Sequence, residues 1–364
     1  MSRVAVVCAY NPRNSGMYSV DLAARHFFAS LGAEHELCVT QNRTKVASLR
    51  YRLVRSVDDL RGFDAVVYWG DFLNNPMWGA GDYAEREVKR HRASGPIEGF
   101  ERWRQLYLHT GAGLPVSTRI YSFGGCFMGM EPTLEDASVR ASMGEFLQRA
   151  SAVVVRDPLS FEALSRLDGG SSKVSLGFDC ASLLMPARGP AAWRGRYFAH
   201  SFSRSLGVEA ARALVEAVER ETGLRGIAVD WLFARWPKRV VHAKFALNLA
   251  LMRHARFCLT DTYHFAVNSM SQGSLPLCVV RDEPAVSSTL NELKKVALFR
   301  MVGLDAALLR VPGEPMQLGS APDMRAVAHV AAQAVSRLGA NHDWRSGFSR
   351  CQADLQGQLR RHFA

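Results

Sequence analysis

The stretch "RFCLTDTYHFAVNSMSQGSLPLCVV" at residues 256–280 carries the pattern that decides the fold. Its two short apolar runs, Phe257–Leu259 and Leu277–Val280, are typical of buried strands, and Phe265–Gln272 between them is predicted to be helical. This order predicts two parallel strands joined by a crossover helix. Asp261 and His264 follow the first strand, at the end where open α/β sheets bind ligands.

The same alternation extends over the whole chain. In the first half, strands are predicted at Val4–Ala9, Glu36–Val39, Ala65–Tyr68, Arg119–Phe123, Ala152–Val155 and Val174–Leu176. Helices are predicted there at Val20–Leu31, Glu98–His109, Leu134–Ala150 and Leu159–Leu167. In the second half, further strands are predicted at Arg196–Ala199 and Arg225–Val229, and helices at Val208–Glu221, Val241–His254 and Ala326–Leu338.

These patterns predict an α/β chain of two Rossmann-like domains whose parallel sheets face a cleft. The segment "PARGPAAWRG" at 186–195 is rich in Pro, Gly and Ala, as interdomain linkers are. We therefore expect an N-terminal domain at 1–188, a C-terminal domain at 189–345 and a C-terminal helix at 346–364.

The composition is that of a soluble globular protein. Of the 364 residues, 48% are hydrophobic and 22% charged, which argues against disorder. No uncharged apolar run approaches the roughly 18 residues of a membrane span, and the first residues lack signal-peptide features. Seven scattered cysteines form no C-x-x-C pair, so a disulfide framework and a zinc site are not expected. We expect a cytoplasmic protein.

The net charge of +11 indicates an anionic partner. The basic residues do not cluster and no nucleic-acid-binding module is recognisable, so nucleic acid is not expected. A small or lipid-linked anionic substrate fits better. Peripheral association with the anionic inner face of a membrane stays open.

Two segments of the first half place charged residues after strands. In "SAVVVRDPLSFEAL" (151–164), Arg156 follows a strand and Asp157 precedes Pro158, a residue favoured at the first helical position. An arginine there suits a carboxylate or phosphate, and the alternative is a surface arginine beside an ordinary cap. Asp179, in "KVSLGFDCASLL" (173–184), also follows a strand, where the alternative is a turn-forming aspartate.

The first turn region, "YNPRNSGMYSVDLAA" (10–24), places Asn14 and Gly16 between a strand and a helix. Backbone amides there could hold an anion, although the segment matches no phosphate-binding motif. His264 is the sharpest catalytic candidate, because an imidazole titrates near neutral pH and Asp261 lies three residues before it. The alternatives are a structural histidine and an aspartate that caps the helix.

The segments 153–184 and 259–280 together resemble the polysaccharide pyruvyltransferase family. That family has a strand followed by Arg-Asp, a Ser-containing helix and a strand ending in Asp. It also has a strand followed by Asp-Arg-x-His, a helix and Gly-x-Pro. Weaker similarity lies in "DAVVYWGD" (64–71) and "YNPRNSGM" (10–17). The resemblance covers most of the chain and is faint at 75–115 and after about 290.

The resemblance implies a GT-B arrangement and transfer of pyruvyl from phosphoenolpyruvate to a glycan or lipid-linked sugar in surface polysaccharide biosynthesis. It implies His264, Asp261 and Asp179 as catalytic residues. Donor binding falls to Arg156, Arg204, Arg281 and Thr262, and acceptor binding to Asn14, Gly16 and Asp71. The resemblance implies neither a cofactor nor a metal.

One departure from the family pattern bears on the donor. Thr262 stands where the family has the arginine of Asp-Arg-x-His, and threonine cannot supply its charge. We expect Arg204, with Arg281 behind it, to substitute. Two alternatives stay open, namely a GT-B glycosyltransferase that uses a nucleotide sugar and a non-catalytic paralogue that binds a glycan or a partner.

Overall fold

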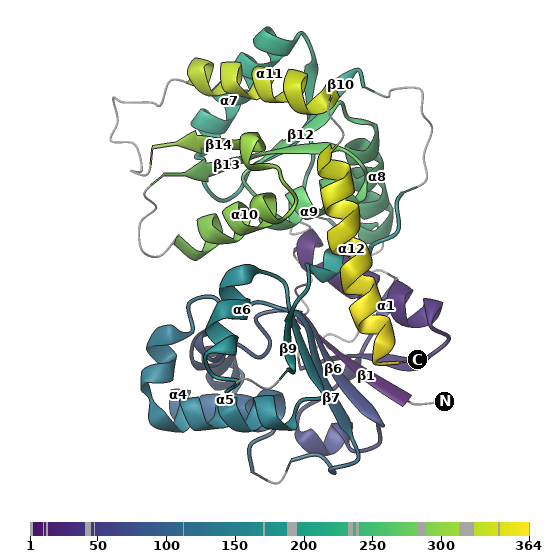
Figure 1. Cartoon of the computed structure of the whole chain (residues 1–364), viewed down its shortest axis with the longest axis vertical. Coiled ribbons are helices and arrows are strands. Elements are labelled where there is room, and N and C mark those ends of the chain that lie inside the picture. Colours follow the sequence, from purple (N-terminus) through teal and green to yellow (C-terminus); the bar gives the residue numbers. More distant parts are fainter. Residues whose placement is uncertain are drawn as a thin grey trace. The chain divides into compact units, whose positions relative to one another are not determined.

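The computed structural model describes residues 3–9, 11, 14–40, 45–46, 48–111, 113–169, 172–187, 195–231, 236–237, 240–282, 289–312, 324–340 and 343–363. The chain packs as two compact units. Unit 1 comprises Met1–Asn11, Val20–Leu183 and Asp354–Ala364, and unit 2 comprises Pro12–Ser19 and Leu184–Ala353. Figure 1 shows the sheets and helices of both units.

Unit 1 is built on a seven-stranded parallel sheet in the order β5-β2-β1-β6-β7-β8-β9. The strands are β1 (Arg3–Cys8), β2 (Glu34–Val39), β5 (Arg52–Leu53), β6 (Ala65–Asp71), β7 (Arg119–Gly125), β8 (Ala152–Val155) and β9 (Val174–Leu176). A separate antiparallel pair joins β3 (Lys45–Val46) and β4 (Leu49–Arg50). The chain order reverses between β1 and β6, which is the topological switch point of this sheet.

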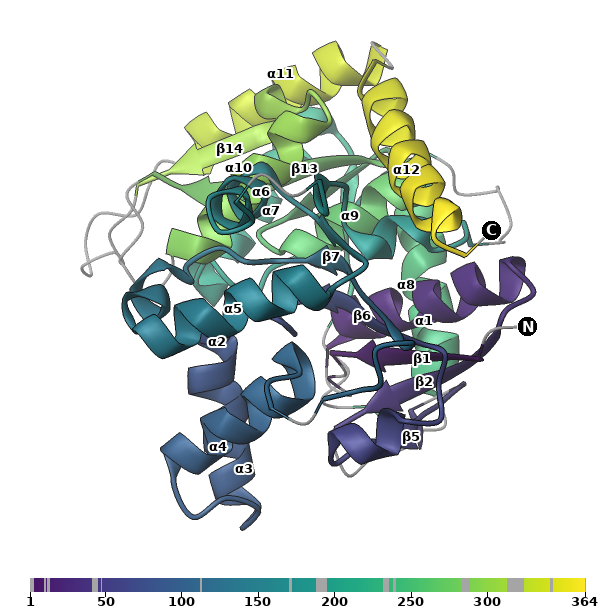
Figure 2. The ribbon, with the colours of Figure 1, turned by 60° about the horizontal axis from the view of Figure 1, so that its bottom comes forward.

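Helices cover both faces of this sheet. They are α1 (Ser15–Ser30), α2 (Pro76–Trp78), α3 (Ala84–Lys89), α4 (Pro96–Trp103), α5 (Ala137–Arg149) and α6 (Pro158–Ser165), with single turns at Val57–Leu60, Gly79–Tyr83, Arg104–Leu108, Glu131–Glu135 and Cys180–Leu183. Figure 2 shows α2, α3 and α4 gathered beside the sheet, between β6 and β7 in the chain. One large core joins β6, β7 and β8 to the helices, through Tyr68, Trp103 and Phe146 among others.

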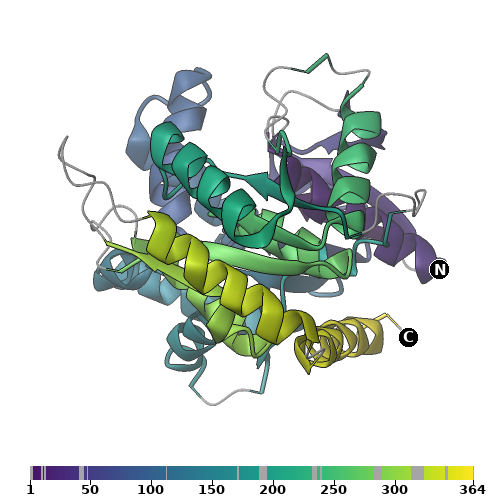
Figure 3. The ribbon, with the colours of Figure 1, turned by 90° about the horizontal axis from the view of Figure 1, so that it is seen from above.

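Unit 2 has a five-stranded parallel sheet in the order β11-β10-β12-β13-β14. Its strands are β10 (Tyr197–Ser201), β11 (Arg225–Ala228), β12 (Phe257–Thr260), β13 (Leu275–Arg281) and β14 (Leu308–Val311). Its helices are α7 (Val208–Thr222), α8 (Val241–His254), α9 (Tyr263–Ser271), α10 (Thr289–Met301), α11 (Met324–Ala340) and most of α12 (Asp343–Arg361), with a turn at Asp305–Ala307. Helices α7 and α11 lie side by side on one face, and α8, α9 and α10 cover the other (Figures 1 and 3).

Two segments group differently from the predicted domain ranges 1–188, 189–345 and 346–364. The first turn of α1 packs in unit 2, where Asn268 Nδ2 donates to Ser19 Oγ at 3.0 Å. The last turns of α12 and the residues after it pack in unit 1, where the Phe363 ring lies 5.3 Å from the rings of Tyr121 and Phe28. The predicted linker at 186–195 falls largely outside the described residues.

Most predicted elements are present, with shifted ends. The predicted helix cap at the end of β8 is confirmed, because Asp157 Oδ1 accepts a hydrogen bond from Ser160 N at 2.7 Å and Pro158 begins α6. The predicted helix 134–150 instead begins at Ala137, since Asp136 caps it through Ser138 N. Sequence patterns missed β14 and α10 altogether. Among the described residues, no helix is both long and apolar enough to cross a bilayer.

Candidate functional site

The switch point of unit 2 lies between β10 and β12. The chain passes from β10 through α7 to β11 on one side, then returns through α8 to β12 on the other side of β10. Open α/β sheets bind ligands outside the carboxyl ends of their strands at this point. The residues found there are the loop Phe202–Gly207 after β10 and the pair Asp261–Thr262 after β12. The segment singled out from the sequence therefore lies at the ligand-binding edge of its sheet.

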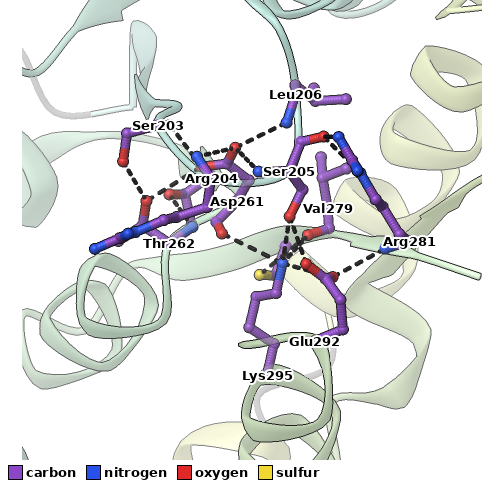
Figure 4. Close-up of polar contacts among 12 residues, drawn as sticks. Ser203, Arg204, Ser205, Leu206, Asp261, Thr262, Val279, Arg281, Glu292 and Lys295 are labelled. Atoms are coloured by element: carbon purple, nitrogen blue, oxygen red, sulfur yellow. Dashed lines mark hydrogen bonds and ion pairs between the residues drawn. The ribbon is translucent and has the colours of Figure 1, made fainter. Parts of the chain in front are cut away.

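Asp261 organises the loop after β10. Its carboxylate is 1% exposed and accepts hydrogen bonds from four successive backbone amides. These come from Ser203 (2.8 Å), Arg204 (2.8 Å), Ser205 (2.6 Å) and Leu206 (3.1 Å). Figure 4 shows this fan of contacts. The carboxylate thus occupies a backbone concavity of the kind that binds anions in other proteins. These four amides donate to Asp261 and not to an external ligand.

A buried ion pair lies beneath the same loop. Lys295 Nζ, on α10, is 2.7 Å from Glu292 Oε2, and the side chains are 1% and 5% exposed. The ammonium also donates to Ser205 Oγ at 2.7 Å, to Val279 O at 2.9 Å and to Asp261 O at 3.3 Å. Ser205 Oγ donates to Glu292 Oε1 at 2.7 Å. The pair therefore joins α10, β13 and the end of β12 to the loop (Figure 4).

The two arginines expected to replace the missing family arginine occupy different positions. Arg281, at the end of β13, is half-buried, and its guanidinium donates twice to Ser205 O, at 2.8 and 2.6 Å. Arg204 is exposed, and its side chain extends away from Glu292 and Lys295 (Figure 4). The Thr262 hydroxyl lies 3.3 Å from the Ser203 hydroxyl and donates to Asp261 Oδ1 at 3.1 Å. Arg204 is thus the more exposed arginine of the two.

His264 lies in the first turn of α9, against the first turn of α1. A Cβ built on Gly16 would lie 2.7 Å from His264 Cβ and 2.8 Å from its Nδ1. Asn14 fixes this turn, because its Oδ1 accepts from Gly16 N at 2.9 Å and its carbonyl accepts from Tyr18 N at 3.1 Å. The structure accounts for Asn14 and Gly16 by helix capping and close packing; their predicted acceptor-binding role stays a prediction.

In unit 1, Arg156, Asp71 and Asp179 come together at the carboxyl ends of β6, β8 and β9. Arg156 Nη1 lies 3.3 Å from Asp179 Oδ2 and 3.9 Å from Asp71 Oδ1. The Arg156 side chain is 1% exposed, so it is not the surface arginine of the alternative interpretation. Asp179 also caps the following turn through Ala181 N at 2.8 Å. Asp71 is the accessible member, with its side chain 25% exposed.

The backbone at Asp71 is unusual. Gly70 and Asp71 both have positive φ, 75° and 54°, at the end of β6. For a residue other than glycine this conformation is uncommon, and such positions cluster at functional sites. Asp71 therefore stays a candidate for a functional carboxylate of unit 1, and its role in acceptor binding stays a prediction.

Sequence patterns gave no signal for several of these groups. The spacing of Glu292 and Lys295 is that of an ordinary exposed helical pair, and α10 itself was not predicted. Asp21 on α1 was missed as well. It is 1% exposed, and this burial raises the pKa of its carboxyl to about 7, although the Tyr51 hydroxyl donates to it at 2.8 Å.

A pocket opens in unit 2 beside the switch point, at the carboxyl ends of β10 and β11. Its volume is about 520 Å³, within the usual range for small-molecule sites. Its apolar lining comes from Phe202, Val208, Ala211, Val215, Val229 and Trp231. Polar groups of Ser203, Arg212, Glu216 and Asp230 also line it. Ser203 belongs both to this pocket and to the loop held by Asp261.

The described part of the chain contains no group of three or more His, Cys, Asp or Glu side chains that could hold a metal ion. No family model and no curated protein sequence matches the chain.

The chain is similar to several solved structures. A putative UDP-N-acetylglucosamine 2-epimerase from Listeria monocytogenes has a TM-score of 0.51 at 9% identity, covering 99% of this chain and 97% of that chain. A UDP-GlcNAc 2-epimerase from Methanocaldococcus jannaschii has a TM-score of 0.48 at 11% identity, covering 96% and 99%. Sucrose-phosphate synthase from Thermosynechococcus elongatus has a TM-score of 0.44 at 13% identity, covering 100% and 99%.

The fold is GT-B-like. At such low identity the likeness shows the architecture alone, two Rossmann-like domains around parallel sheets, and this confirms the predicted fold class.

Proposed function

We propose that the chain is a GT-B-type transferase whose donor is a nucleotide-linked sugar bound by unit 2. The observation that carries this proposal is that Ser203 lines an apolar pocket and also belongs to the polar loop after β10. On one side lies an apolar pocket of about 520 Å³, and on the other lie the hydroxyl and guanidinium groups of the switch-point loop. An apolar pocket beside an anion-compatible edge suits a nucleoside joined to a diphosphate.

The pocket would hold the nucleoside. The half-buried Phe202 offers aromatic surface to a planar base, and the Asp230 and Glu216 carboxylates can accept hydrogen bonds from ribose hydroxyls. Phosphoenolpyruvate has no part that needs such a pocket. This difference favours a nucleotide sugar over the pyruvyl donor implied by the sequence resemblance.

The diphosphate would lie at the switch point. Arg204 offers an exposed guanidinium, and the Ser203 and Thr262 hydroxyls lie 3.3 Å apart beside the first turn of α9. The amide end of a helix favours negative charge, so α9 adds to the attraction. Arg204 and Thr262 thus keep their predicted donor-binding roles under a different donor.

In the proposed transfer, the bond between sugar C1 and the diphosphate oxygen breaks, and its electron pair stays on the departing nucleotide. An acceptor hydroxyl forms the new bond to C1, and its proton passes to His264. The acceptor-binding role predicted for Asp71 from the sequence stays a prediction. His264→Gln should then lower turnover by about 10²–10⁴-fold.

Pyruvyl transfer is the second candidate, favoured by the family-like spacing of Asp261 and His264 and by Arg156 after its strand. In that reaction Arg204 would bind the carboxylate or phosphate of phosphoenolpyruvate. Arg156, however, is buried against Asp179 and needs no external anion.

Calorimetry of the full chain with UDP, ADP, GDP and dTDP, against phosphoenolpyruvate, tests the proposal. We expect one nucleoside diphosphate to bind, and Ala211→Leu, which fills the pocket, to weaken its affinity at least about tenfold. Ala213→Leu, on the exposed side of the same helix, is the matched control. Binding of phosphoenolpyruvate alone, indifferent to Ala211→Leu, would return the chain to the pyruvyl reading. Binding of neither would favour a non-catalytic paralogue.

A further inference from the structure

The four charged side chains that lie buried or half-buried beneath the switch-point loop carry no net charge as a group. Asp261 and Glu292 carry two negative charges, and Lys295 and Arg281 carry two positive charges. Arg204, the fifth charged residue of the group, is exposed, and its positive charge is not offset by a negative charge of the group. The surplus positive charge of the group therefore belongs to its most exposed member.

We propose that Glu292 and Lys295 are a positioning pair, which holds the loop Ser203–Leu206 in the conformation that presents Arg204 to the donor diphosphate. The inference rests on the proposed function, and it names the residues that set the affinity of that site for phosphate.

Ser205 is the point through which the pair acts. Its hydroxyl accepts from Lys295 Nζ at 2.7 Å and donates to Glu292 Oε1 at 2.7 Å. Its amide donates to Asp261, and its carbonyl accepts two bonds from Arg281. Every polar atom of Ser205 is thus bound by a charged side chain. Arg204 precedes it directly, so the backbone from which the Arg204 side chain starts is fixed.

An ionic pair is a poor choice for stability alone. Removing two charges from water costs several kcal/mol per ion, and apolar replacements of buried pairs are often neutral or stabilising. The charged groups contribute directional hydrogen bonds to several elements at once. The three ammonium hydrogens of Lys295 point at four acceptors, which lie on α10, on β13, directly after β12 and in the loop, and which an apolar side chain could not join. This geometry suits a device that fixes one loop conformation.

A thermodynamic cycle separates positioning from bulk stability. The double variant Glu292→Gln with Lys295→Met removes both charges together, so no lone charge is left buried. We expect its melting temperature to stay within a few degrees of the unsubstituted chain. Its Kd for the nucleoside diphosphate that binds best among UDP, ADP, GDP and dTDP should rise at least about tenfold. Arg204→Ala should raise the Kd by a similar factor, because a charge-assisted contact is lost.

The decisive measurement is the triple variant. If the pair acts through Arg204, removing the pair from the Arg204→Ala background should change the Kd for the same nucleoside diphosphate by less than about twofold. Additive losses in the triple variant would overturn the proposal, and so would an unchanged Kd in the double variant. The control is Asp282→Asn with Arg310→Gln, an exposed pair beside the same strand, which should leave the Kd unchanged.

Amide hydrogen exchange of the ligand-free chain distinguishes failure of the inference from failure of the proposed function. The amides of Ser205 and Leu206 should exchange at least about tenfold faster in the double variant than in the control pair. If the unsubstituted chain binds no nucleotide, the proposed function fails, and the exchange rates still decide whether the pair orders the loop. Equal rates in both variants would overturn the positioning role whatever ligand binds.

Discussion

Gly16 and His264 touch so closely that no side chain fits between them. A methyl group on residue 16 would lie 2.7–2.8 Å from three atoms of His264, including its Cβ near the root of the side chain. Because the contact is with the base of the imidazole rather than with a flexible tip, the ring cannot simply swing aside. The glycine therefore sets the position of the imidazole at the start of α9.

Gly16→Ala should displace His264 and destabilise the chain by about 1–3 kcal/mol, the usual range for overpacking. Denaturant unfolding measures the change. Gly144→Ala on α5 is the control, since a Cβ there meets nothing within 4 Å, and it should stabilise the chain by about 0.5–1 kcal/mol. An equal effect of both substitutions would show that the contact with His264 does not constrain the first turn of α1.

Asp261→Asn should act mainly on stability. An amide has one acceptor oxygen and two donor hydrogens, whereas the native carboxylate accepts from four backbone amides. We expect a loss of about 2–4 kcal/mol in the free energy of unfolding. Asp305→Asn, at an exposed position, should change it by less than about 0.5 kcal/mol. A stable Asp261→Asn variant with lost turnover would instead support the catalytic role implied by the family resemblance.

Arg156→Ala leaves Asp179 buried and without the guanidinium, so it should cost about 3–5 kcal/mol of stability. This differs from the simple loss of anion binding expected of an accessible arginine. Arg166→Ala, in an exposed pair with Glu162 on the neighbouring helix, should cost about 0–1 kcal/mol. Thermal unfolding compares the two variants, and similar melting temperatures would count against the structural role of Arg156.

The raised pKa of the buried Asp21 carboxyl should make the stability of the chain depend on pH. Burial raises the pKa of its carboxyl from 3.8 to about 7, with a further raising effect of nearby Asp71, so the folded chain holds a proton that the unfolded chain releases. Its contribution to stability is therefore complete only below about pH 3.8, and it is lost as the pH rises through about 7. Asp21→Asn should be close to neutral at pH 4 and stabilising, on the order of a few kcal/mol, at pH 8. Urea unfolding at both pH values measures this, and a pH-independent difference would place the carboxyl pKa at its ordinary value.

The alternation of apolar runs was enough to predict the parallel sheets, because strands buried on both faces leave continuous runs such as Ala152–Val155. The same reasoning correctly placed Asp261 after a strand and Asp157 at a helix start. It could not show what their carboxylates bind. The four amides on Asp261 come from a loop more than fifty residues earlier in the chain, and local patterns carry no information about such contacts.

Lys295 is a residue whose burial the sequence pattern did not predict. A lysine three residues after a glutamate predicts a solvated helix face, yet this one is almost completely buried. Burial follows from the packing of α10 against β13, which depends on the whole of unit 2. Arg156 was likewise expected to bind an external anion from its place after a strand, and only the convergence of three strand ends brings Asp179 beside it.

The carboxylate of Asp261 works as a built-in counter-ion for the loop after β10. Loops that close around phosphate commonly order themselves only when the ligand arrives, and the ligand's affinity is reduced by the conformational entropy lost at that moment. Here the protein supplies its own anion, so the loop is folded before any ligand binds. A donor that binds beside Ser203 and Arg204 therefore meets a preorganised surface. Its affinity is not reduced by the loss of conformational entropy that ordering this loop would require.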